Sequence, residues 1–278
     1  YVNSSGTFVV QDRNLGATRA DRGSGDQWKE AKGIMYEWGR KDPFIFDDVD
    51  GKIVGTRNSN RITIAESISD PTCFAGGSNG WESSGSKASL WLPSKKTIYD
   101  PCPVGYKVAR KEIWADFSKT GSNVQNNVDE FNVSGPHNNG WDFYYDGTNT
   151  TYIPANDAIN YYYQYDHRNN IGDLWSSDAT SGTKAYRWYY TYSDASNCGM
   201  LILYSEITSH AMSLRCMKDE THVDLAFPMV EMVGAKDVTT ESVRILFNIT
   251  SEGLAEVTEA GVIYGTAPGL SLENGTKV

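Results

Sequence analysis

Aromatic side chains crowd the second half of the chain and give the strongest sign of a binding surface. Residues 141–192 hold 15 of the 34 Trp, Tyr and Phe residues. Neighbouring side chains in a strand point to opposite faces, so the three residues of Tyr161–Tyr163 cannot all face one core. Tyrosine among Ser, Gly, Asn and Asp offers a large, stiff contact area with a polar tip, as in antibody paratopes. Ordinary packing in a sheet is the alternative, because Tyr and Trp favour strands.

This crowding predicts a ligand-binding surface in the loops of residues 119–170, a long stretch with little regular periodicity. Rings there would stack on a sugar or a protein without a metal, and neighbouring polar groups would supply hydrogen bonds. The predicted ligand-binding residues are Trp141, Tyr144, Tyr145, Tyr161, Tyr163, Tyr165, Asp166, His167 and Arg168.

Known catalytic and metal-binding signatures are missing from the sequence. It contains no phosphate-binding loop, dinucleotide fingerprint or zinc-protease motif, and its four His residues are scattered. Glu112 and Asp116 share one face of an expected helix, as many solvated carboxylates do. Residues 47–51 resemble the start of an EF-hand loop without the final acidic ligand, so a turn is favoured there. We therefore expect a protein that is not an enzyme and that holds no metal or cofactor.

Composition narrows the class of partner. The chain has 278 residues, a formal net charge of −10 and a pI near 4.9. Nucleic-acid binding needs a basic footprint and is therefore not expected. No apolar run approaches the roughly 18 residues of a membrane-spanning helix. The chain begins at Tyr1 rather than Met, so we interpret it as a processed piece, and the missing signal peptide does not argue against export.

Four cysteines allow three disulfide connectivities. Cys102 lies in the rigid sequence Asp-Pro-Cys-Pro-Val-Gly, and Cys216 lies in an alternating apolar strand. We favour a bond between these two, with Cys73 and Cys198 either paired together or free. Closing so long a loop would stabilise the fold by roughly 4–5 kcal/mol, and it would indicate an oxidising compartment.

Two helices are expected to position these residues. Ser24 and Gln27 have the spacing of a capping box, and an apolar face continues from there to Trp38. The second expected helix runs from Arg110 to Ser118. Short strands are expected at residues 7–10, 52–54, 61–64, 172–176, 185–192, 200–204 and 211–217.

The composition changes after residues 218–220. Strands are expected at residues 230–233, 242–249 and 260–264, with turn signals between them. Only 58 residues remain from Thr221 onward, fewer than the roughly 100 of a complete β-sandwich. Missing strands, a neighbouring domain or another subunit would be needed to cover the unfilled edge.

Five short motifs follow one another in the order of a known family. Together they resemble the Fibrobacter succinogenes major paralogous domain, a family abundant on Bacteroidetes surfaces, over about residues 7–219. The motifs are Asp12–Ala17, Tyr36–Phe44, Asp100–Tyr106, Trp175–Ser177 and Leu214–Cys216.

The resemblance implies an α+β, C-type-lectin-like domain with two helices and a mostly antiparallel sheet. A bond such as Cys102–Cys216, from the first-helix region to the last strand, is that fold's signature. Ala109 and Arg110 replace the family's usual Pro and Ser or Thr before the second helix. The Glu/Gln-Pro-Asn/Asp tripeptide of calcium-dependent lectins is absent. The tail from Phe227 resembles fibronectin-type-III-like or Ig-like modules. The expected domains are therefore residues 1–220 and the partial β-sandwich 221–278.

The expected function is adhesion or ligand recognition by a secreted or cell-surface protein, anchored to the outer membrane of a bacterium. The expected partner is a glycan or a host or bacterial surface protein. A pilus or surface-assembly component is the first alternative, in which the truncated module pairs with a neighbouring chain. A polysaccharide-active enzyme is the second alternative.

Overall fold

A computed structural model describes residues 1–47, 52–84, 89–135, 139–164, 169–181, 183–221, 229–251, 260–264 and 276–277. The chain divides into two compact units, Tyr1–His222 and Val223–Val278. Strands make up most of the regular structure in both units, which fits a β-rich or α+β class.

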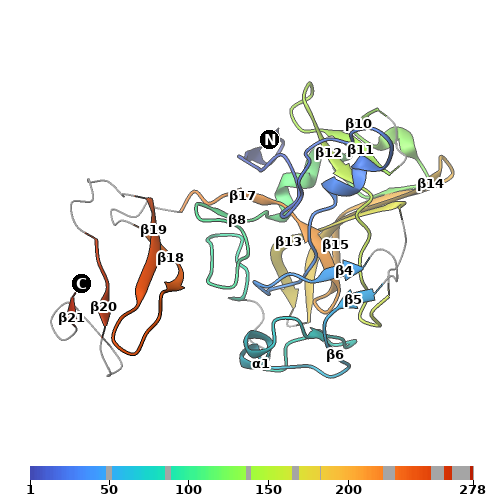
Figure 1. The fold of residues 1–278 in the computed structure, drawn as a ribbon. Helices are drawn as coiled ribbons and strands as arrows, with labels where there is room; N and C mark the ends of the chain where they lie inside the picture. The colour runs from blue at the N-terminus through green and yellow to red at the C-terminus, as the bar shows by residue number, and fades with distance from the viewer. Residues whose placement is uncertain are drawn as a thin grey trace. The chain divides into compact units, whose positions relative to one another are not determined.

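A six-stranded mixed sheet forms the centre of the first unit (Figure 1). Its long strands are β13, β14 and β15, which follow one another as antiparallel hairpins, and β16 runs parallel to β13. The expected strands at 172–176, 185–192 and 200–204 lie inside these elements and are confirmed. In sheet order the strands are β3 (Tyr36–Glu37), β16 (Ala211–Leu214), β13 (Ile171–Ser181), β14 (Lys184–Asp194), β15 (Asn197–Ile207) and β9 (Val124–Gln125).

Residues 119–170 contain more regular structure than their sequence suggests. Three strands in this stretch form a separate antiparallel sheet: β10 (Val133–Ser134), β11 (Gly140–Tyr144) and β12 (Thr150–Pro154). Burial alternates along β11, where Trp141 and Phe143 are buried while Asp142 and Tyr144 are half-buried. Two aromatic residues therefore anchor the hairpin in the core, and the expectation of an irregular loop was wrong here.

The first expected helix ends before the apolar residues that predicted its second half. It is a 3-10 helix, η1 (Gly25–Ala31), and the Gln27 side chain accepts a hydrogen bond from the Ser24 N–H at 2.9 Å. Gly33 follows with a φ of +75°, a left-handed conformation that cannot continue a right-handed helix. The chain then enters β3, so the expected continuation to Trp38 was wrong.

A further helix replaces an expected strand. The strand predicted at residues 61–64 is wrong, because Thr63 caps α1 (Ile64–Ser69) by accepting a hydrogen bond from the Glu66 N–H. The second expected helix is present as the 3-10 helix η3 (Lys111–Phe117), and its large apolar residues Ile113, Trp114 and Phe117 are buried. A short turn, η4 (Val128–Glu130), follows it.

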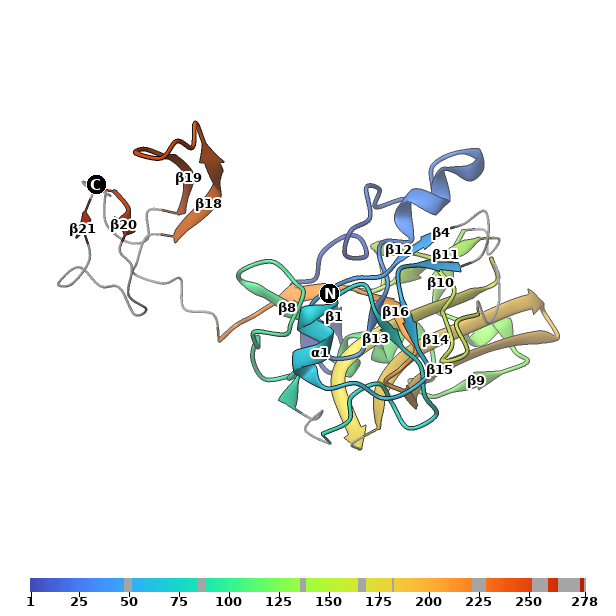
Figure 2. The same ribbon diagram turned by 60° about the horizontal axis from the view of Figure 1, so that its bottom comes forward.

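Short strand pairs surround the central sheet. Four pairs are described, and each is a ladder of two or three residues. Figure 2 shows the same unit from a second side. The pairs are β1 (Val2–Asn3) with β2 (Gly6–Thr7), β4 (Ile45–Asp47) with β5 (Lys52–Val54), β6 (Arg57–Asn58) with β7 (Phe74–Ala75), and β8 (Tyr106–Val108) with β17 (Cys216–Lys218).

Hydrophobic cores lie on both faces of the central sheet. Leu174 and Trp175 are neighbours on β13 and belong to different core clusters, because successive strand residues point to opposite faces. One cluster joins Trp114 of η3 to Trp188 of β14, and the other includes Trp38.

The disulfide joins Cys102 to Cys216 with a Cα–Cα distance of 5.7 Å, which confirms the favoured pairing. Cys73 and Cys198 are both free. Asp100, 1% exposed, holds the turn before β8: its carboxylate accepts hydrogen bonds from the Cys102 and Val108 N–H groups at 2.9 and 2.8 Å.

The described residues of the second unit form two antiparallel strand pairs. β18 (Met229–Lys236) pairs with β19 (Arg244–Ser251), and β20 (Ile263–Tyr264) pairs with β21 (Thr276–Lys277). The first three of these strands overlap the segments expected at 230–233, 242–249 and 260–264. Among the described residues, no helix is long and apolar enough to cross a membrane.

Candidate functional site

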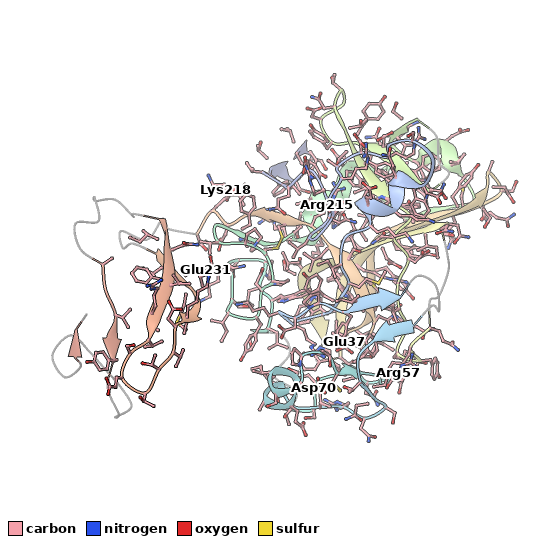
Figure 3. All side chains as sticks on the ribbon, in the orientation of Figure 1. Glu37, Arg57, Asp70, Arg215, Lys218 and Glu231 are labelled. Carbon is pink, nitrogen blue, oxygen red and sulfur yellow. A yellow bond between two sulfur atoms is a disulfide. The ribbon has the colours of Figure 1, made fainter. Side chains whose placement is uncertain are left out.

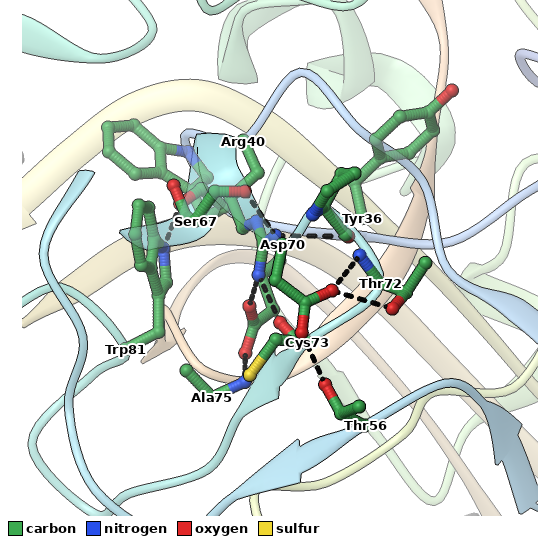
Figure 4. A network of polar contacts seen from close by, with 12 residues as sticks. Tyr36, Arg40, Thr56, Ser67, Asp70, Thr72, Cys73, Ala75 and Trp81 are labelled. Carbon is green, nitrogen blue, oxygen red and sulfur yellow. Dashed lines mark hydrogen bonds and ion pairs between the residues drawn. The ribbon is translucent and has the colours of Figure 1, made fainter. Parts of the chain in front are cut away.

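The motif Tyr36–Phe44 builds a buried scaffold. Arg40 donates hydrogen bonds to the Glu37 carboxylate at 2.9 Å and to the carbonyl oxygens of Cys73 and Pro71 (Figure 4). Its guanidinium also lies 5.5 Å from the Trp81 ring centroid. The hydrogen bonds of Arg40 and Glu37 join α1 and β7 to the sheet. Both side chains are almost completely buried, so neither can contact a ligand.

A pocket of about 390 Å³ lies where three segments of the first unit meet. These segments are the N-terminal strand pair, the loop of residues 10–21 and the β11–β12 hairpin. Its lining residues are Tyr1, Val10, Asp12, Ala20, Asp21, Asp142, Tyr145, Thr150, Thr151 and Tyr152.

Backbone hydrogen bonds hold the three walls together. The Val2 N–H donates to the Tyr145 carbonyl at 3.1 Å, which joins the N-terminal segment to the hairpin. The Gln11 and Leu15 N–H groups donate to the carbonyls of Cys216 and Leu214, which joins the loop to the disulfide-bonded strand. The pocket walls are therefore fixed to the central sheet.

An aromatic platform forms one side of the pocket. The rings of Tyr1 and Tyr145 stack with centroids 4.8 Å apart and an interplanar angle of 24°. Tyr1 also packs against Trp114 and Phe117 of η3. These neighbours hold the ring pair in place, so a stacking ligand would meet a preformed surface.

Two of the three pocket carboxylates are held in ion pairs. Asp12 receives two hydrogen bonds from Arg13, at 2.8 and 3.0 Å, which lower its pKa. Asp21 accepts a hydrogen bond from Arg19 at 2.6 Å. These pairs reduce the freedom of both acidic groups to bind elsewhere.

Asp142 is the third carboxylate, and it has no hydrogen bond or ion pair among the described residues. Its partial burial raises its pKa, and the charge of Arg22 opposes this effect. Across the strand pair it faces Tyr152, whose hydroxyl donates to the Asn139 carbonyl at 2.7 Å. Asp142 therefore offers acceptor oxygens to a molecule in the pocket.

Arg215 lies behind the pocket, at the junction of β16 and β17 (Figure 3). It is 1% exposed and donates to the Asn14 side chain and the Tyr1 hydroxyl, each at 2.9 Å, to the Thr151 hydroxyl and to the Tyr152 carbonyl. One buried side chain thus contacts all three walls of the pocket.

The predicted ligand-binding residues do not gather in one place. Tyr145 lines the pocket, and Tyr144 is half-buried on the same hairpin. Trp141 is 3% exposed and packs against Phe131 and Tyr192, so its ring offers almost no surface on which a ligand could stack. Its inward direction follows from the alternation along β11. The remaining predicted positions at 165–168, Tyr165, Asp166, His167 and Arg168, lie outside the described residues.

The tyrosines at 161–163 lie in a separate turn. Tyr162 is 64% exposed and its ring centroid lies 4.1 Å from that of Tyr161, which in turn stacks on His210. Tyr163 points inward against Phe74 at 5.2 Å. The expectation that three successive tyrosines cannot face one core is confirmed, although the exposed member is Tyr162.

Most pocket residues escaped prediction because they come from distant parts of the chain. Asp12 and Arg215 stand in motifs that the family resemblance marked, which was the available signal. Nothing in the sequence places Tyr1 beside Tyr145, because their contact spans more than a hundred residues.

No family model, curated protein or solved structure matches this chain. A stacked tyrosine pair, an unpaired carboxylate and several hydroxyl groups can bind a polar organic ligand through stacking and hydrogen bonds. Among the described residues, no group of His, Cys, Asp and Glu could hold a metal ion.

Proposed function

We propose that the protein is a non-enzymatic recognition domain that binds carbohydrate in this pocket, as an adhesion protein does. The observation that carries the proposal is the Tyr1–Tyr145 ring pair beside Asp142 in a single pocket. Aromatic faces stack on sugar rings, and a carboxylate accepts hydrogen bonds from their hydroxyl groups.

Recognition is favoured over turnover because of the state of the acidic groups. Asp12 and Asp21 form ion pairs with Arg13 and Arg19. The hydrogen bonds from Arg13 lower the pKa of Asp12, which disfavours the protonated form that a general acid needs. In the pocket, burial raises the pKa of Asp142 in the direction that suits a general acid. A hydrolase would need a second, available carboxylate beside it.

A secreted or surface-displayed location accords with the Cys102–Cys216 bond, because disulfides persist in oxidising compartments. The same bond, which ends on β17 at the end of the first unit, supports a C-type-lectin-like fold for residues 1–220. The two strand pairs of the second unit support a fibronectin-type-III-like or Ig-like module.

A glycan array with the complete chain tests the proposal. Tyr145→Ala should weaken binding at least tenfold, because it removes half of the ring pair. Tyr144→Ala is the matched control, since its side chain belongs to the same hairpin but does not line the pocket. Near-UV circular dichroism would establish that both variants are folded. Binding should not change when EDTA is added, because stacking and hydrogen bonds require no metal.

Unchanged binding in Tyr145→Ala would rule out the pocket as the site, and loss of binding in EDTA would require a metal. Loss of binding in Tyr162→Ala alone would move the site to the 160–164 turn.

A second candidate function is surface assembly through the second unit. Its β18 exposes apolar side chains at Val230, Met232 and Val233, which are 58%, 72% and 59% exposed. Surfaces of this kind commonly mark protein contacts. Analytical ultracentrifugation should then detect concentration-dependent oligomers of the complete chain, and oligomers should disappear when residues 223–278 are removed. A monomer at all concentrations would exclude this role.

A further inference from the structure

Arg215 orients two hydroxyl groups of the pocket. It donates a hydrogen bond to the Tyr1 hydroxyl and another to the Thr151 hydroxyl, and both residues line the pocket. A guanidinium carries only donors, so each hydroxyl oxygen must be the acceptor. The hydroxyl hydrogens are therefore left to donate elsewhere.

Neither hydroxyl donates to another protein group within the described part of the chain. Each is instead available to donate to a molecule in the pocket. The buried positive charge polarises both O–H groups and strengthens them as donors. The pocket thus combines two oriented donors with the acceptor oxygens of Asp142.

The charged side chains around the pocket balance. Asp12 is paired with Arg13, and Arg19 serves both Asp21 and Glu30, at 2.6 and 3.8 Å. Asp142 is influenced by Arg22, and the charge of Arg215 also lowers the pKa of Asp12. Four carboxylates therefore stand against four guanidinium groups, which are Arg13, Arg19, Arg22 and Arg215.

The distribution of these charges disfavours an acidic ligand. All three charged side chains that line the pocket are aspartates, and the Tyr1 ammonium is bonded to the Phe8 carbonyl. Arg215 is buried and donates to neutral groups of the lining. A ligand carboxylate or sulfate would approach Asp142 without a cationic side chain among the lining residues to receive it. Repulsion of this kind provides specificity against the wrong ligand.

We propose that the pocket selects uncharged, polyhydroxylated sugar units, and that Arg215 is the positioning residue that sets this specificity. The Tyr1 and Thr151 hydroxyls would donate to oxygen atoms of the sugar, Asp142 would accept from its hydroxyl groups, and the ring pair would stack on its apolar face. This inference rests on the proposed carbohydrate-binding function and deepens it by naming the ligand class.

Isothermal titration of the complete chain with hexasaccharides of different charge tests the ligand class. The probes are cellohexaose, maltohexaose and mannohexaose as neutral sugars, hexagalacturonate as an acidic sugar and hexaglucosamine as a cationic one. We expect at least one neutral sugar to bind, and to bind at least tenfold more tightly than hexagalacturonate. Tighter binding of hexagalacturonate or hexaglucosamine than of every neutral sugar would overturn the inference.

Two pairs of variants test the residues. Thr151→Val removes the donor and should weaken binding of the best neutral sugar about tenfold, while Thr151→Ser keeps the hydroxyl and should retain binding. Asp142→Asn should weaken neutral-sugar binding and reduce the discrimination against hexagalacturonate. Asp129→Asn, on the exposed turn η4, removes the same charge far along the chain and should change neither property.

The outcomes separate this inference from the proposed function. If Tyr145→Ala abolishes binding while Thr151→Val and Asp142→Asn leave it unchanged, the pocket is the site but the inference fails. If Thr151→Val unfolds, Asp142→Asn still tests the inference. This variant is expected to fold, because it breaks no hydrogen bond to the Asp142 side chain among the described residues. If none of the five sugars binds, the proposed function fails as well.

Discussion

Buried charge distinguishes two arginines of this protein. Arg40 donates to an acidic side chain, Glu37, whereas Arg215 donates to neutral oxygen atoms in all of its hydrogen bonds among the described residues. Removing a partner from a buried charge is costly, so both networks must remain complete in the folded state. We therefore interpret Arg40 as a structural residue of the scaffold. Arg215 instead acts through the pocket-lining groups to which it donates.

The titration of Glu37 should make stability depend on pH. Burial raises the pKa of Glu37 to about 8, against the opposing effect of Arg40. Because this pKa lies above the ordinary value of 4.5, the folded state retains a proton that the unfolded state has lost. The free energy of unfolding should therefore fall as the pH rises from about 5 to about 8.

Urea unfolding of Glu37→Gln at several pH values checks this prediction. In the native protein, the free energy of unfolding should fall by about 1.4 kcal/mol for each unit by which the Glu37 pKa is raised. The variant should lose most of this decline. Glu30→Gln, at an exposed position, should keep the decline. An equal slope in Glu37→Gln and the native protein would contradict the buried titration.

At the scale of the elements, the long hairpins of the central sheet require a glycine at one close contact. Gly172 of β13 lies opposite Tyr190 of β14, and a Cβ atom at Gly172 would lie 2.0 Å from a Tyr190 ring carbon. Tyr190 is 1% exposed, so its ring has little room to move.

We expect Gly172→Ala to lower the free energy of unfolding by about 1–3 kcal/mol through overpacking. Gly199→Ala in β15 is the control, because its nearest neighbouring atom would lie at an ordinary 3.4 Å. Thermal unfolding of both variants decides the point. Equal melting temperatures would mean that the Tyr190 ring can be displaced at little cost.

The disulfide connects the β8 region to the end of the first unit. It closes a loop between residues 114 apart in sequence. Replacing both Cys102 and Cys216 by Ala should lower the free energy of unfolding by roughly 4–5 kcal/mol, chiefly because the unfolded chain gains conformational entropy. Guanidinium unfolding measures this loss, and Cys73→Ser provides the control at a free, half-buried thiol. A loss below 1 kcal/mol would show that packing alone holds these segments.

At the scale of the whole molecule, the two units are expected to be separable. The pocket, its Arg215 and the disulfide all belong to residues 1–222. A protein ending at residue 222 should therefore keep its melting temperature within a few degrees and its affinity for sugar within about twofold. Calorimetry and titration of the shortened protein check both. A shortened protein that cannot fold would show that the second unit stabilises the first.

The sequence alone predicted several features whose causes are local. Strand-like segments at residues 172–176, 185–192 and 200–204 predicted β13, β14 and β15, and the amphipathic spacing predicted the helix at η3. The rigid sequence around Cys102 and the strand around Cys216 predicted the disulfide. In each case the signal lies within one element or a few neighbouring residues, where period and composition determine the backbone.

Only the tertiary structure decided which aromatic side chains face solvent and which residues share the pocket. Trp141 turns inward because β11 pairs with β12, and Tyr145 meets Tyr1 because a backbone hydrogen bond joins their segments. Arg215 acquires its role from acceptors on three separate segments. Contacts of this kind depend on register and long-range packing, which local sequence patterns do not encode.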